Sequence, residues 1–325
     1  MQNKDISICY LRCVSMFFII LCHIVSNSST AIISMTSQFF NVGVSIFFFI
    51  SGYLFGKKGV NCTVKEFYKR RYWRVFFTYH IFLLILFILY LILNQEIIFV
   101  RWLSYVFCIQ TIVQSNILGA GHLWFLTVIM ICYLVTPFLN NFRSSKNMGL
   151  VILTSFMISI IIAFTIKEGL GGNLTGMTTY FIGYYVGMID YKYSKKSYIL
   201  ATVFIVISVI LRLIFKYTFD GTILYNVILT FITQNIFAIS IFVIFKNLDL
   251  KENKLITFID SISYEIYLVH YMFIIGPVFV IGVNGNLTHN LLIDSVVILF
   301  FILISATILK KVANESFIFI KERIK

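Results

Sequence analysis

Blocks of about twenty apolar residues recur along the whole chain. A helix needs roughly 20 residues to cross the ~30 Å hydrocarbon core of a bilayer, so each block is long enough to span a membrane. The blocks lack the period-2 alternation of a membrane β-barrel, which favours a helical bundle. Composition agrees, because 60% of the 325 residues are hydrophobic and 12% are charged. A soluble domain would carry about twice that charged fraction.

Ten such blocks predict ten membrane crossings. They occupy residues 8–25, 39–56, 75–93, 121–139, 149–166, 178–189, 198–215, 222–245, 262–283 and 290–309. An even number of crossings places both ends of the chain on the same side of the membrane. No linker, low-complexity tract or internal repeat divides the sequence, so we predict one integral membrane domain over residues 1–325. The expected fold is all-α, a polytopic transmembrane bundle of about ten helices.

Positive charge gathers on one side of this predicted bundle. Of the 26 lysines and arginines, 21 fall in the terminal segments or in the loops on the same side as the termini. Three lie in the opposite loops, and Arg12 and Arg212 lie within predicted helices. The positive-inside rule therefore predicts cytoplasmic N- and C-termini. Topology explains the net charge of +13, and we do not expect nucleic-acid binding.

The first apolar block and the cysteines bear on whether the chain has a signal peptide, a disulfide or a metal site. The first block carries Arg12 and lacks a small-residue cleavage pattern, so we interpret it as a retained helix rather than a signal peptide. The six cysteines show no zinc-site spacing and fall mostly inside helices or at their cytoplasmic ends. Buried cysteine usually behaves as a small hydrophobic residue. We predict no disulfide and no bound metal.

Glycine, proline and aromatic residues predict local features of the bundle. The external segment 167–176 holds four glycines; with no strand before it, a flexible connector is favoured over a phosphate-binding loop. Gly183 and Gly187 form a Gly-x-x-x-Gly pair, which predicts close packing of two helices. The aromatic residues of the external segment 94–120 predict a short helix in the outer interface. Pro277 predicts a kink in the ninth crossing.

Two ionisable residues lie in the first predicted helix. Arg12 and His23 are eleven residues apart, which is three helical turns and about 20°, so they share one face about 16 Å apart along the axis. Ionisable groups at membrane depth are costly and need a partner or a task. The spacing is equally consistent with an arginine that reaches the inner headgroups and a histidine that meets the outer interface.

A basic cluster leads into the third crossing. It comprises Lys69, Arg70, Arg71 and Arg74. Topology and attraction to anionic lipid are sufficient reasons for such a cluster. Arg71 and Arg74 also stand one helical turn apart, and arginine binds phosphate in a bidentate manner. A phosphate site at the cytoplasmic end of the bundle is the alternative interpretation.

Further polar residues lie in the ninth crossing and at the outer side. Ser263, Tyr267 and His270 share a helical face, and Glu265 sits one turn in from the cytoplasm. An inter-helix hydrogen-bond network and catalysis explain these residues equally well. On the outer side, His122 begins the fourth crossing at the level that His23 should reach. Asp294, one turn into the tenth crossing, is placed either to orient a histidine or to cap its helix.

Six motifs in order resemble those of one enzyme family. They are the Arg12-x10-His23 spacing, residues 41–54 (NVGVSIFFFISGYL), residues 71–74 (RYWR), residues 121–126 (GHLWFL), residues 181–187 (FIGYYVG) and residues 263–270 (SYEIYLVH). Over nearly its whole length the chain resembles the acyltransferase 3 family of membrane-bound O-acyltransferases, most of which are bacterial. The order of six motifs along the expected helices carries this resemblance, since each motif alone is weak.

The resemblance implies transfer of an acyl group, usually acetyl from acetyl-CoA, to a hydroxyl of a saccharide. The acceptor would be a cell-surface glycan such as an exopolysaccharide of the cell envelope, free or lipid-linked. His23 would be the catalytic histidine with Arg12 as its companion, and Arg71 and Arg74 would help to bind the donor. The remaining motif positions, without individual roles, are His122, Tyr267 and His270.

The resemblance also implies a setting for the enzyme. A multi-pass protein of a bacterial cytoplasmic membrane would take acyl-CoA as co-substrate and contact membrane lipids, with no bound cofactor. Some relatives carry a C-terminal extracellular hydrolase-like domain, whereas about 16 residues follow the last predicted crossing here. We therefore expect either one membrane domain that completes the transfer or a separate extracytoplasmic partner.

These assignments give a mechanistic hypothesis. CoA phosphates would bind Arg71 and Arg74, and the pantetheine arm would extend towards His23. His23 would deprotonate the acceptor or first accept the acyl group itself. Arg12 lies too far along a continuous helix to contact the same carbonyl, so we expect a structural or donor-side role for it. The alternative function is a transporter or flippase for a lipid-linked saccharide, which would consume no acetyl-CoA and show inverted repeats; we find no such repeat.

Overall fold

The predicted helical fold is confirmed. A computed structural model describes residues 5–28, 30–189, 191–276, 278, 281–282, 285–286 and 290–323. Its α-helices are α1 (Ile6–Ser26), α2 (Ala31–Met35), α3 (Ser37–Phe40), α4 (Val42–Lys58), α5 (Val64–Arg71), α6 (Phe77–Ile92), α7 (Phe99–Val106), α8 (Trp124–Leu139), α9 (Ser145–Thr165), α10 (Glu168–Met188), α11 (Lys195–Phe219), α12 (Thr230–Asn247), α13 (Lys254–Ser261), α14 (Ser263–Ile274) and α15 (Leu291–Arg323).

Shorter elements connect or extend these helices. Tyr72–Phe76 (η1) and Leu224–Leu229 (η4) are π-helical, and Gly121–Leu123 (η2) and Asn140–Phe142 (η3) are 3-10 turns. Two-residue strands β1 (Ile281–Gly282) and β2 (Gly285–Asn286) pair antiparallel. Pro277, predicted to kink the ninth crossing, lies outside the described residues.

Polar caps start several helices. The Thr63 hydroxyl accepts a hydrogen bond from the backbone N–H of Glu66 before α5, and Ser144 serves the same purpose before α9. Ser194 and Ser197 form a reciprocal capping box at the start of α11. Each cap satisfies a backbone donor that has no partner within the first helical turn. Polar residues thus define where these helices begin.

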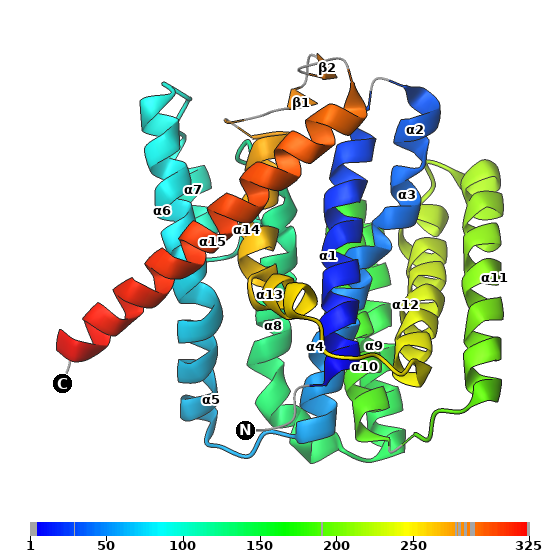
Figure 1. The fold of residues 1–325 in the computed structure, drawn as a ribbon. Coiled ribbons are helices and arrows are strands. Elements are labelled where there is room, and N and C mark those ends of the chain that lie inside the picture. Colours follow the sequence, from blue (N-terminus) through cyan, green and yellow to red (C-terminus); the bar gives the residue numbers. More distant parts are fainter. Residues whose placement is uncertain are drawn as a thin grey trace. The chain divides into compact units, whose positions relative to one another are not determined.

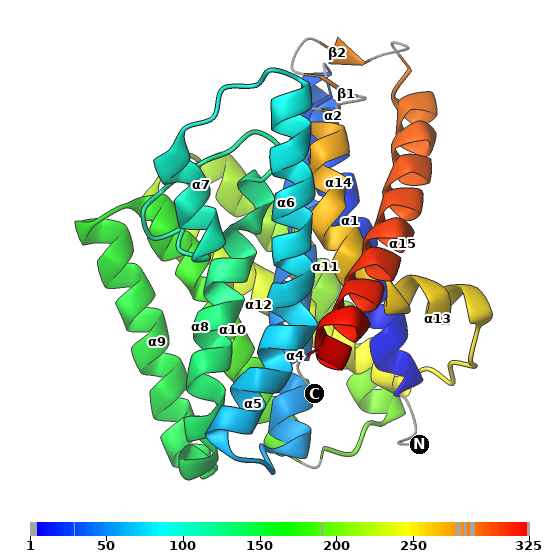
Figure 2. The ribbon, with the colours of Figure 1, turned by 90° about the vertical axis from the view of Figure 1, so that its left-hand side faces the viewer.

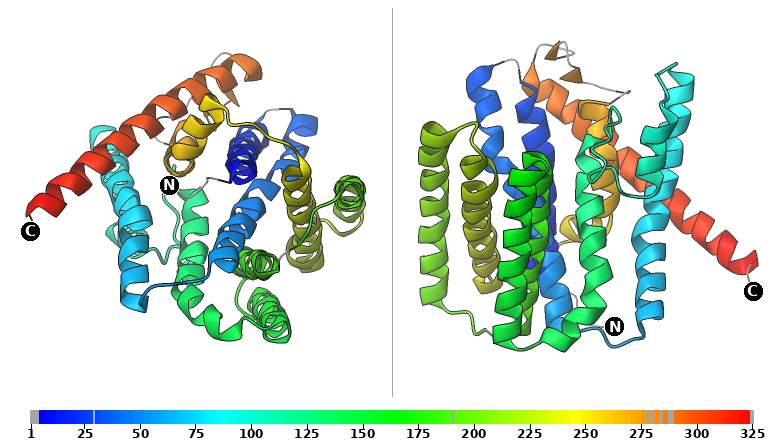
Figure 3. Two further views of the ribbon diagram at one scale, coloured as in Figure 1. Left: turned by 60° about the horizontal axis from the view of Figure 1, so that its bottom comes forward. Right: turned by 180° about the vertical axis from the view of Figure 1, so that it is seen from behind.

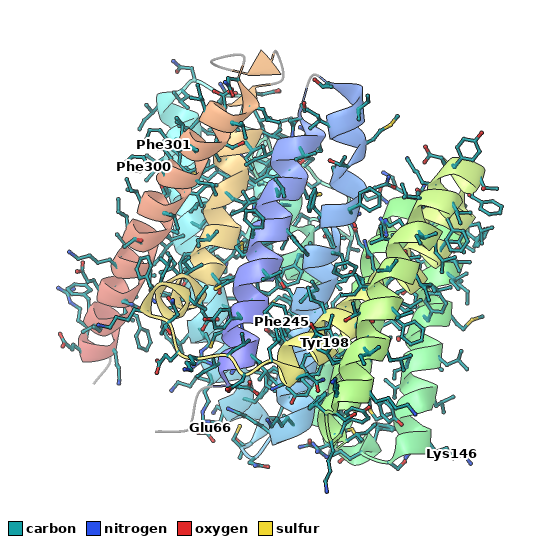
Figure 4. The ribbon with its side chains drawn as sticks, turned by 45° about the vertical axis from the view of Figure 1, so that its right-hand side comes forward. Glu66, Lys146, Tyr198, Phe245, Phe300 and Phe301 are labelled. Atoms are coloured by element: carbon teal, nitrogen blue, oxygen red, sulfur yellow. The ribbon has the colours of Figure 1, made fainter. Side chains whose placement is uncertain are left out.

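Within the described residues, eight helices are long and apolar enough to cross a membrane. They cover Ile6–Ser26, Ile32–Lys58, Val64–Ile92, Gly121–Phe142, Lys146–Thr165, Lys195–Phe219, Leu224–Asn247 and Leu291–Arg323. The other two predicted crossings fall in α10, which is rich in glycine and threonine, and in α14, which is 12 residues long. Large apolar side chains such as Tyr198 of α11 and Phe300 of α15 are exposed (Figure 4), as expected of lipid-facing surfaces.

The chain forms two compact units. The first comprises residues 1–19, 41–61 and 128–260, and the second comprises residues 20–40, 62–127 and 261–325. Helices α1, α8 and α13 contribute residues to both units.

Close packing of α4 against α10 organises the first unit (Figure 3). A Cβ added to Gly183 would lie 2.1 Å from the Phe49 carbonyl oxygen, and one on Gly187 would lie 2.3 Å from that of Tyr53. The predicted packing role of the Gly-x-x-x-Gly pair is therefore confirmed. Gly52 supplies the same close approach from α4, since its Cβ would lie 1.9 Å from the Tyr180 carbonyl oxygen.

The prediction of a flexible connector at residues 167–176 is wrong, because α10 begins at Glu168. At two of its glycines, neighbouring atoms leave no room for a side chain. A Cβ on Gly171 would lie 2.4 Å from the Cβ of Ala163, and one on Gly176 would lie 2.4 Å from the Phe48 ring. Helix packing, rather than loop flexibility, accounts for these glycines, and the contacts offset their poor helix propensity.

Gly52→Ala is expected to lower the melting temperature of the purified protein. The added methyl would contact backbone, and overpacking typically costs about 1–3 kcal/mol. Gly149→Ala in α9 is the matched control, since its Cβ would meet nothing within 4 Å and alanine favours a helix. Fluorescence-detected size exclusion after heating measures both variants. A Gly52→Ala protein as stable as Gly149→Ala would contradict the close approach of α4 and α10.

In the second unit, α6, α14 and α15 lie against one another (Figures 1 and 2). Phe273 of α14 stacks on Phe301 of α15 with 5.9 Å between ring centroids. At the other end of α15, Phe317 contacts Trp73 at 5.1 Å. α7 confirms a short helix within residues 94–120, and its Trp102 and Tyr105 side chains are buried. This framework holds the ends of α1 and α14 beside the start of α8.

Candidate active site

Three histidines from distant parts of the sequence meet in the second unit. His23 lies near the end of α1, His122 in η2 and His270 in α14. The centroid of the His270 ring is 5.4 Å from that of His23 and 4.7 Å from that of His122. The two histidines that we placed at one level of the bundle therefore belong to one cluster.

Two tyrosines complete this cluster. The Tyr267 hydroxyl donates a hydrogen bond to the backbone carbonyl of His122, and its ring lies 5.1 Å from the His122 ring. Tyr271 lies edge-on to His23 at 4.8 Å and stacks on His122 at 4.9 Å. We call His23, His122, Tyr267, His270 and Tyr271 the histidine cluster.

The hydrogen bond of His270 defines its protonation. Nδ1 of His270 lies 2.7 Å from the backbone carbonyl of Tyr267. A carbonyl oxygen only accepts, so Nδ1 carries the hydrogen. In a neutral ring Nε2 is then an acceptor, and this atom is buried without a hydrogen-bond partner among the described residues. The ring is 0% exposed, which favours the neutral form over a buried charge.

His122 is held among aromatic rings. Its side chain is 4% exposed, and both ring nitrogens lack hydrogen-bond partners within the described part of the chain. A buried polar group without a partner costs about 1–3 kcal/mol. Such groups are rare in folded proteins, and His122 is therefore an unusual member of this part of the bundle.

His23 is the accessible member of the three histidines. Its residue is half-buried, whereas His122 and His270 are buried. Its backbone carbonyl accepts hydrogen bonds from the Ser26 hydroxyl and the Asn27 side-chain amide, which fix the last turn of α1. His23 is therefore the least buried of the three histidines, and the His270 ring lies beside its ring.

A thiol near the cluster is poorly suited to carry an acyl group. Cys108 follows α7 and is 5% exposed. Burial raises the pKa of its thiol to about 12, against the opposing effect of hydrogen bonds with Gln110, Thr127 and Tyr79. Because the thiolate is the reactive form, this cysteine is a weak nucleophile at neutral pH. The histidines are the stronger candidates for the chemistry.

Arg12 has a specific partner within the first unit. Its Nη1 lies 2.9 Å from Oδ1 of Asp260, and the Asp260 side chain is 2% exposed. The pair links the beginning of α1 to α13, 248 positions away in sequence. The arginine offsets part of the cost of burying the Asp260 carboxylate. The contact joins α1 to α13 within the first unit.

The helix changes its geometry between Arg71 and Arg74. α5 ends at Arg71 and the next five residues are π-helical. The expectation that these arginines stand one α-helical turn apart is therefore wrong, because a π-helix has more residues per turn. Arg71 lies 5.7 Å from the centre of the Phe67 ring, and Arg74 is exposed. π-Helical turns are frequent at functional sites.

Glu265 and Asp294 lie outside the histidine cluster. Glu265 is 9% exposed, and its Oε2 has no hydrogen-bond partner among the residues described. Asp294 is fully buried in the first turn of α15. The cap of that helix is Asn290, whose Oδ1 accepts from the backbone N–H groups of Leu292 and Ile293. Asp294 therefore does not cap its helix.

Sequence reasoning missed two members of these arrangements. Tyr271 was not singled out, although it follows His270 directly and lies one helical turn beyond Tyr267. Asp260 was not proposed as the partner of Arg12; its position at the cytoplasmic end of the ninth predicted crossing was the available signal. Ser263, predicted on the same face as Tyr267 and His270, is buried in the first turn of α14.

The comparisons with known proteins give one match. A family model described as an acyltransferase domain matches residues 5–310. Neither the curated proteins nor the solved structures provide a match. The matched residues include every member of the histidine cluster as well as Arg12, Arg71 and Arg74. Together with the membrane-spanning helices, this match establishes that the chain belongs to the acyltransferase 3 family and is a multi-pass membrane acyltransferase.

Proposed function

We propose that this protein transfers an acyl group, acetyl in the simplest case, from acyl-CoA to a hydroxyl of a cell-surface or lipid-linked saccharide. The donor binds from the cytoplasm, where the charge distribution places both termini. The histidine cluster supports the proposal, because ring nitrogens of His122 and His270 have no hydrogen-bond partner among the described residues. The setting we propose is the bacterial cytoplasmic membrane.

Histidine chemistry suits this reaction. A saccharide hydroxyl is a poor nucleophile and needs a positioned base, and imidazole is the side-chain base best matched to neutral pH. His23 is accessible and takes this role. His270, with Nε2 as an acceptor, positions the His23 ring; catalytic hydrogen bonds often tighten only once substrate is bound.

The proposed steps conserve atoms and charge. The acceptor oxygen bonds to the thioester carbonyl carbon as its proton moves to the unprotonated nitrogen of His23. The tetrahedral intermediate then breaks its carbon–sulfur bond, and the His23 imidazolium returns the proton to the departing CoA thiolate. In the alternative route His23 first accepts the acyl group covalently. A rapid-quench reaction without acceptor distinguishes the routes, because only the covalent route leaves labelled acyl-His23.

The arginines have two different roles in the proposed reaction. Arg71 and Arg74 bind phosphate oxygens of CoA, since guanidinium groups match phosphate in geometry and charge. Arg12 does not contact the reacting carbonyl; its role is structural, through its ion pair with Asp260. His122, Tyr267 and Tyr271 shape the surroundings of His23, and we give them positioning roles.

The test uses full-length protein in nanodiscs, which expose both membrane faces. The substrates are [14C]acetyl-CoA and polysaccharide extracted from a strain of the native organism that lacks the gene. We expect alkali-labile label in the polysaccharide and an equal amount of free CoA thiol. Parallel reactions with longer acyl-CoA donors determine the acyl group.

Two results would contradict the proposal. One is an unlabelled polysaccharide with no release of CoA from any donor. The other, in sealed vesicles, is movement of the polysaccharide across the membrane without acyl-CoA consumption, as a flippase would produce. Membership of an acyltransferase family favours acyl transfer over a flippase function.

A further inference from the structure

A small cavity lies in the second unit, which also contains the histidine cluster. Its volume is about 190 Å³. Its walls come from the end of α6, from α7 with the residues before it, and from the loop that precedes η2. All three segments belong to the same compact unit as the cluster.

The cavity walls are held in place by specific contacts. The Tyr90 hydroxyl donates to the Leu118 carbonyl at 2.8 Å, and its ring lies edge-on to Trp102 at 5.1 Å. The Tyr105 hydroxyl donates to the Ala120 carbonyl and accepts from the Ile117 backbone N–H. The site is therefore largely formed before any ligand binds, which lowers the ordering cost of binding.

Both charged side chains of segment 94–120 line the cavity. Glu96 and Arg101 are the only charged residues between positions 94 and 120, and both line it. Both are exposed, and neither forms an ion pair with a residue that the structure describes. Gln95 and Asn116 add amide donors and acceptors, and the mostly buried rings of Trp102 and Tyr90 add a small aromatic surface. The lining thus combines hydroxyl-binding groups with an apolar wall.

This lining matches a sugar ring better than the other components of the reaction. A carboxylate accepts from hydroxyls, a guanidinium donates to oxygens, and amides do both. One acid and one base leave no net positive charge, which disfavours a lipid pyrophosphate or the CoA phosphates. The polar rim disfavours an acyl chain. The volume is below the ~300 Å³ at which pockets for larger ligands begin, so it suits a single sugar residue of a longer glycan.

Gly121 connects the cavity to the cluster. A Cβ at Gly121 would lie 3.3 Å from Oδ1 of Asn116, which lines the cavity, and 3.5 Å from the hydroxyl of Tyr271, which contacts His23. Gly121 also immediately precedes His122. The cavity wall and the cluster therefore meet across one residue that has no side chain.

We infer that this cavity binds the sugar residue next to the reacting hydroxyl of the saccharide acceptor. Glu96 and Arg101 hold its hydroxyls, Trp102 and Tyr90 provide its apolar surface, and Gly121 leaves room for the hydroxyl to approach His23. The inference rests on the proposed function, because it names the acceptor site of that reaction.

The test measures acceptor and donor affinity separately in the nanodisc assay described above. Glu96→Gln and Arg101→Gln are each expected to raise the KM for the extracted polysaccharide about tenfold or more, the typical effect of losing a hydrogen bond to a charged group. The KM for acetyl-CoA should remain unchanged. Glu252→Gln is the matched control, because Glu252 is an exposed carboxylate of the first unit.

Gly121→Ala provides a second variant. Its methyl would lie close to Asn116 and fill the space next to the Tyr271 hydroxyl, so we expect slower transfer to the polysaccharide with an unchanged KM for acetyl-CoA. Melting temperatures verify that each variant is folded. Methyl glycosides of common hexoses should compete with the polysaccharide in wild type and compete less well in Glu96→Gln.

The outcomes separate the two proposals. Wild-type transfer together with an acceptor KM within twofold of wild type in both pocket variants would overturn the cavity assignment and leave the acyltransfer reaction standing. Absence of acyl transfer by the wild-type protein would overturn the proposed function and, with it, this acceptor site. A raised KM for acetyl-CoA in the pocket variants would assign the cavity to the donor instead.

Discussion

Replacing His23 with glutamine is expected to lower kcat for acyl transfer by about 10²–10⁴-fold, the usual contribution of a general base. Glutamine keeps a polar side chain of similar length but cannot take up the acceptor proton. His23 is the one histidine of the cluster that is not buried, so substrate access depends on it. The measurement is the initial rate of label transfer to polysaccharide at saturating acetyl-CoA.

His80→Gln is the matched control for this variant. His80 lies in α6, where its ring nitrogens face the backbone carbonyls of Phe76 and Val106 at 2.7 and 3.0 Å. It is not a member of the histidine cluster, and we expect kcat within about threefold of wild type, as for other changes away from the reacting groups. A folded His23→Gln protein with near-wild-type turnover would show that another group removes the proton.

Replacing Arg71 with alanine is expected to raise the KM for acetyl-CoA about 10- to 100-fold, because a hydrogen bond to a charged group contributes about 1.5–3 kcal/mol. kcat at saturating donor should change much less, since Arg71 is assigned to binding rather than to the reacting carbonyl. Acetyl-pantetheine sharpens the test because it lacks the phosphates. Wild type and Arg71→Ala should show equal KM values for that donor.

Arg70→Ala controls for the loss of positive charge at the same place. Arg70 is exposed and pairs with Glu66 on its own helix, so its removal should alter the KM for acetyl-CoA by less than about threefold, as is typical of exposed ion pairs. If Arg71→Ala and Arg70→Ala change the KM equally, the effect is general electrostatics and Arg71 is not a specific phosphate ligand. An unchanged KM in Arg71→Ala would remove Arg71 from the donor site altogether.

The positions of the long helices were predictable from the sequence. The apolar blocks at 8–25, 75–93 and 198–215 became α1, α6 and α11 because uninterrupted apolar stretches of this length can satisfy their backbone only as helices in a membrane. The loop predicted for segment 167–176 was wrong. Its glycines favour a loop when considered locally, yet it is helical, and Gly171 and Gly176 permit contacts with Ala163 and Phe48 that a larger residue would prevent.

The members of the candidate site were predictable only one at a time. Motif positions identified His23, His122, Tyr267 and His270, but no spacing rule placed each of these rings within 6 Å of at least one other. Tyr271 was missed because a tyrosine beside a histidine is common on an apolar helix. The π-helical turn after Arg71 was also missed, since apolar periodicity does not reveal which carbonyl each N–H binds.

The sequence by itself determined that this chain is a helical membrane protein, because hydrocarbon thickness acts on each segment separately. Its charge asymmetry predicts the orientation in the membrane. Only the tertiary structure decided which polar groups meet. Arg12 found Asp260, three histidines came together, and Glu96 and Arg101 came to line one cavity. Such contacts join residues far apart in sequence, and they depend on how side chains pack between helices, which no single segment encodes.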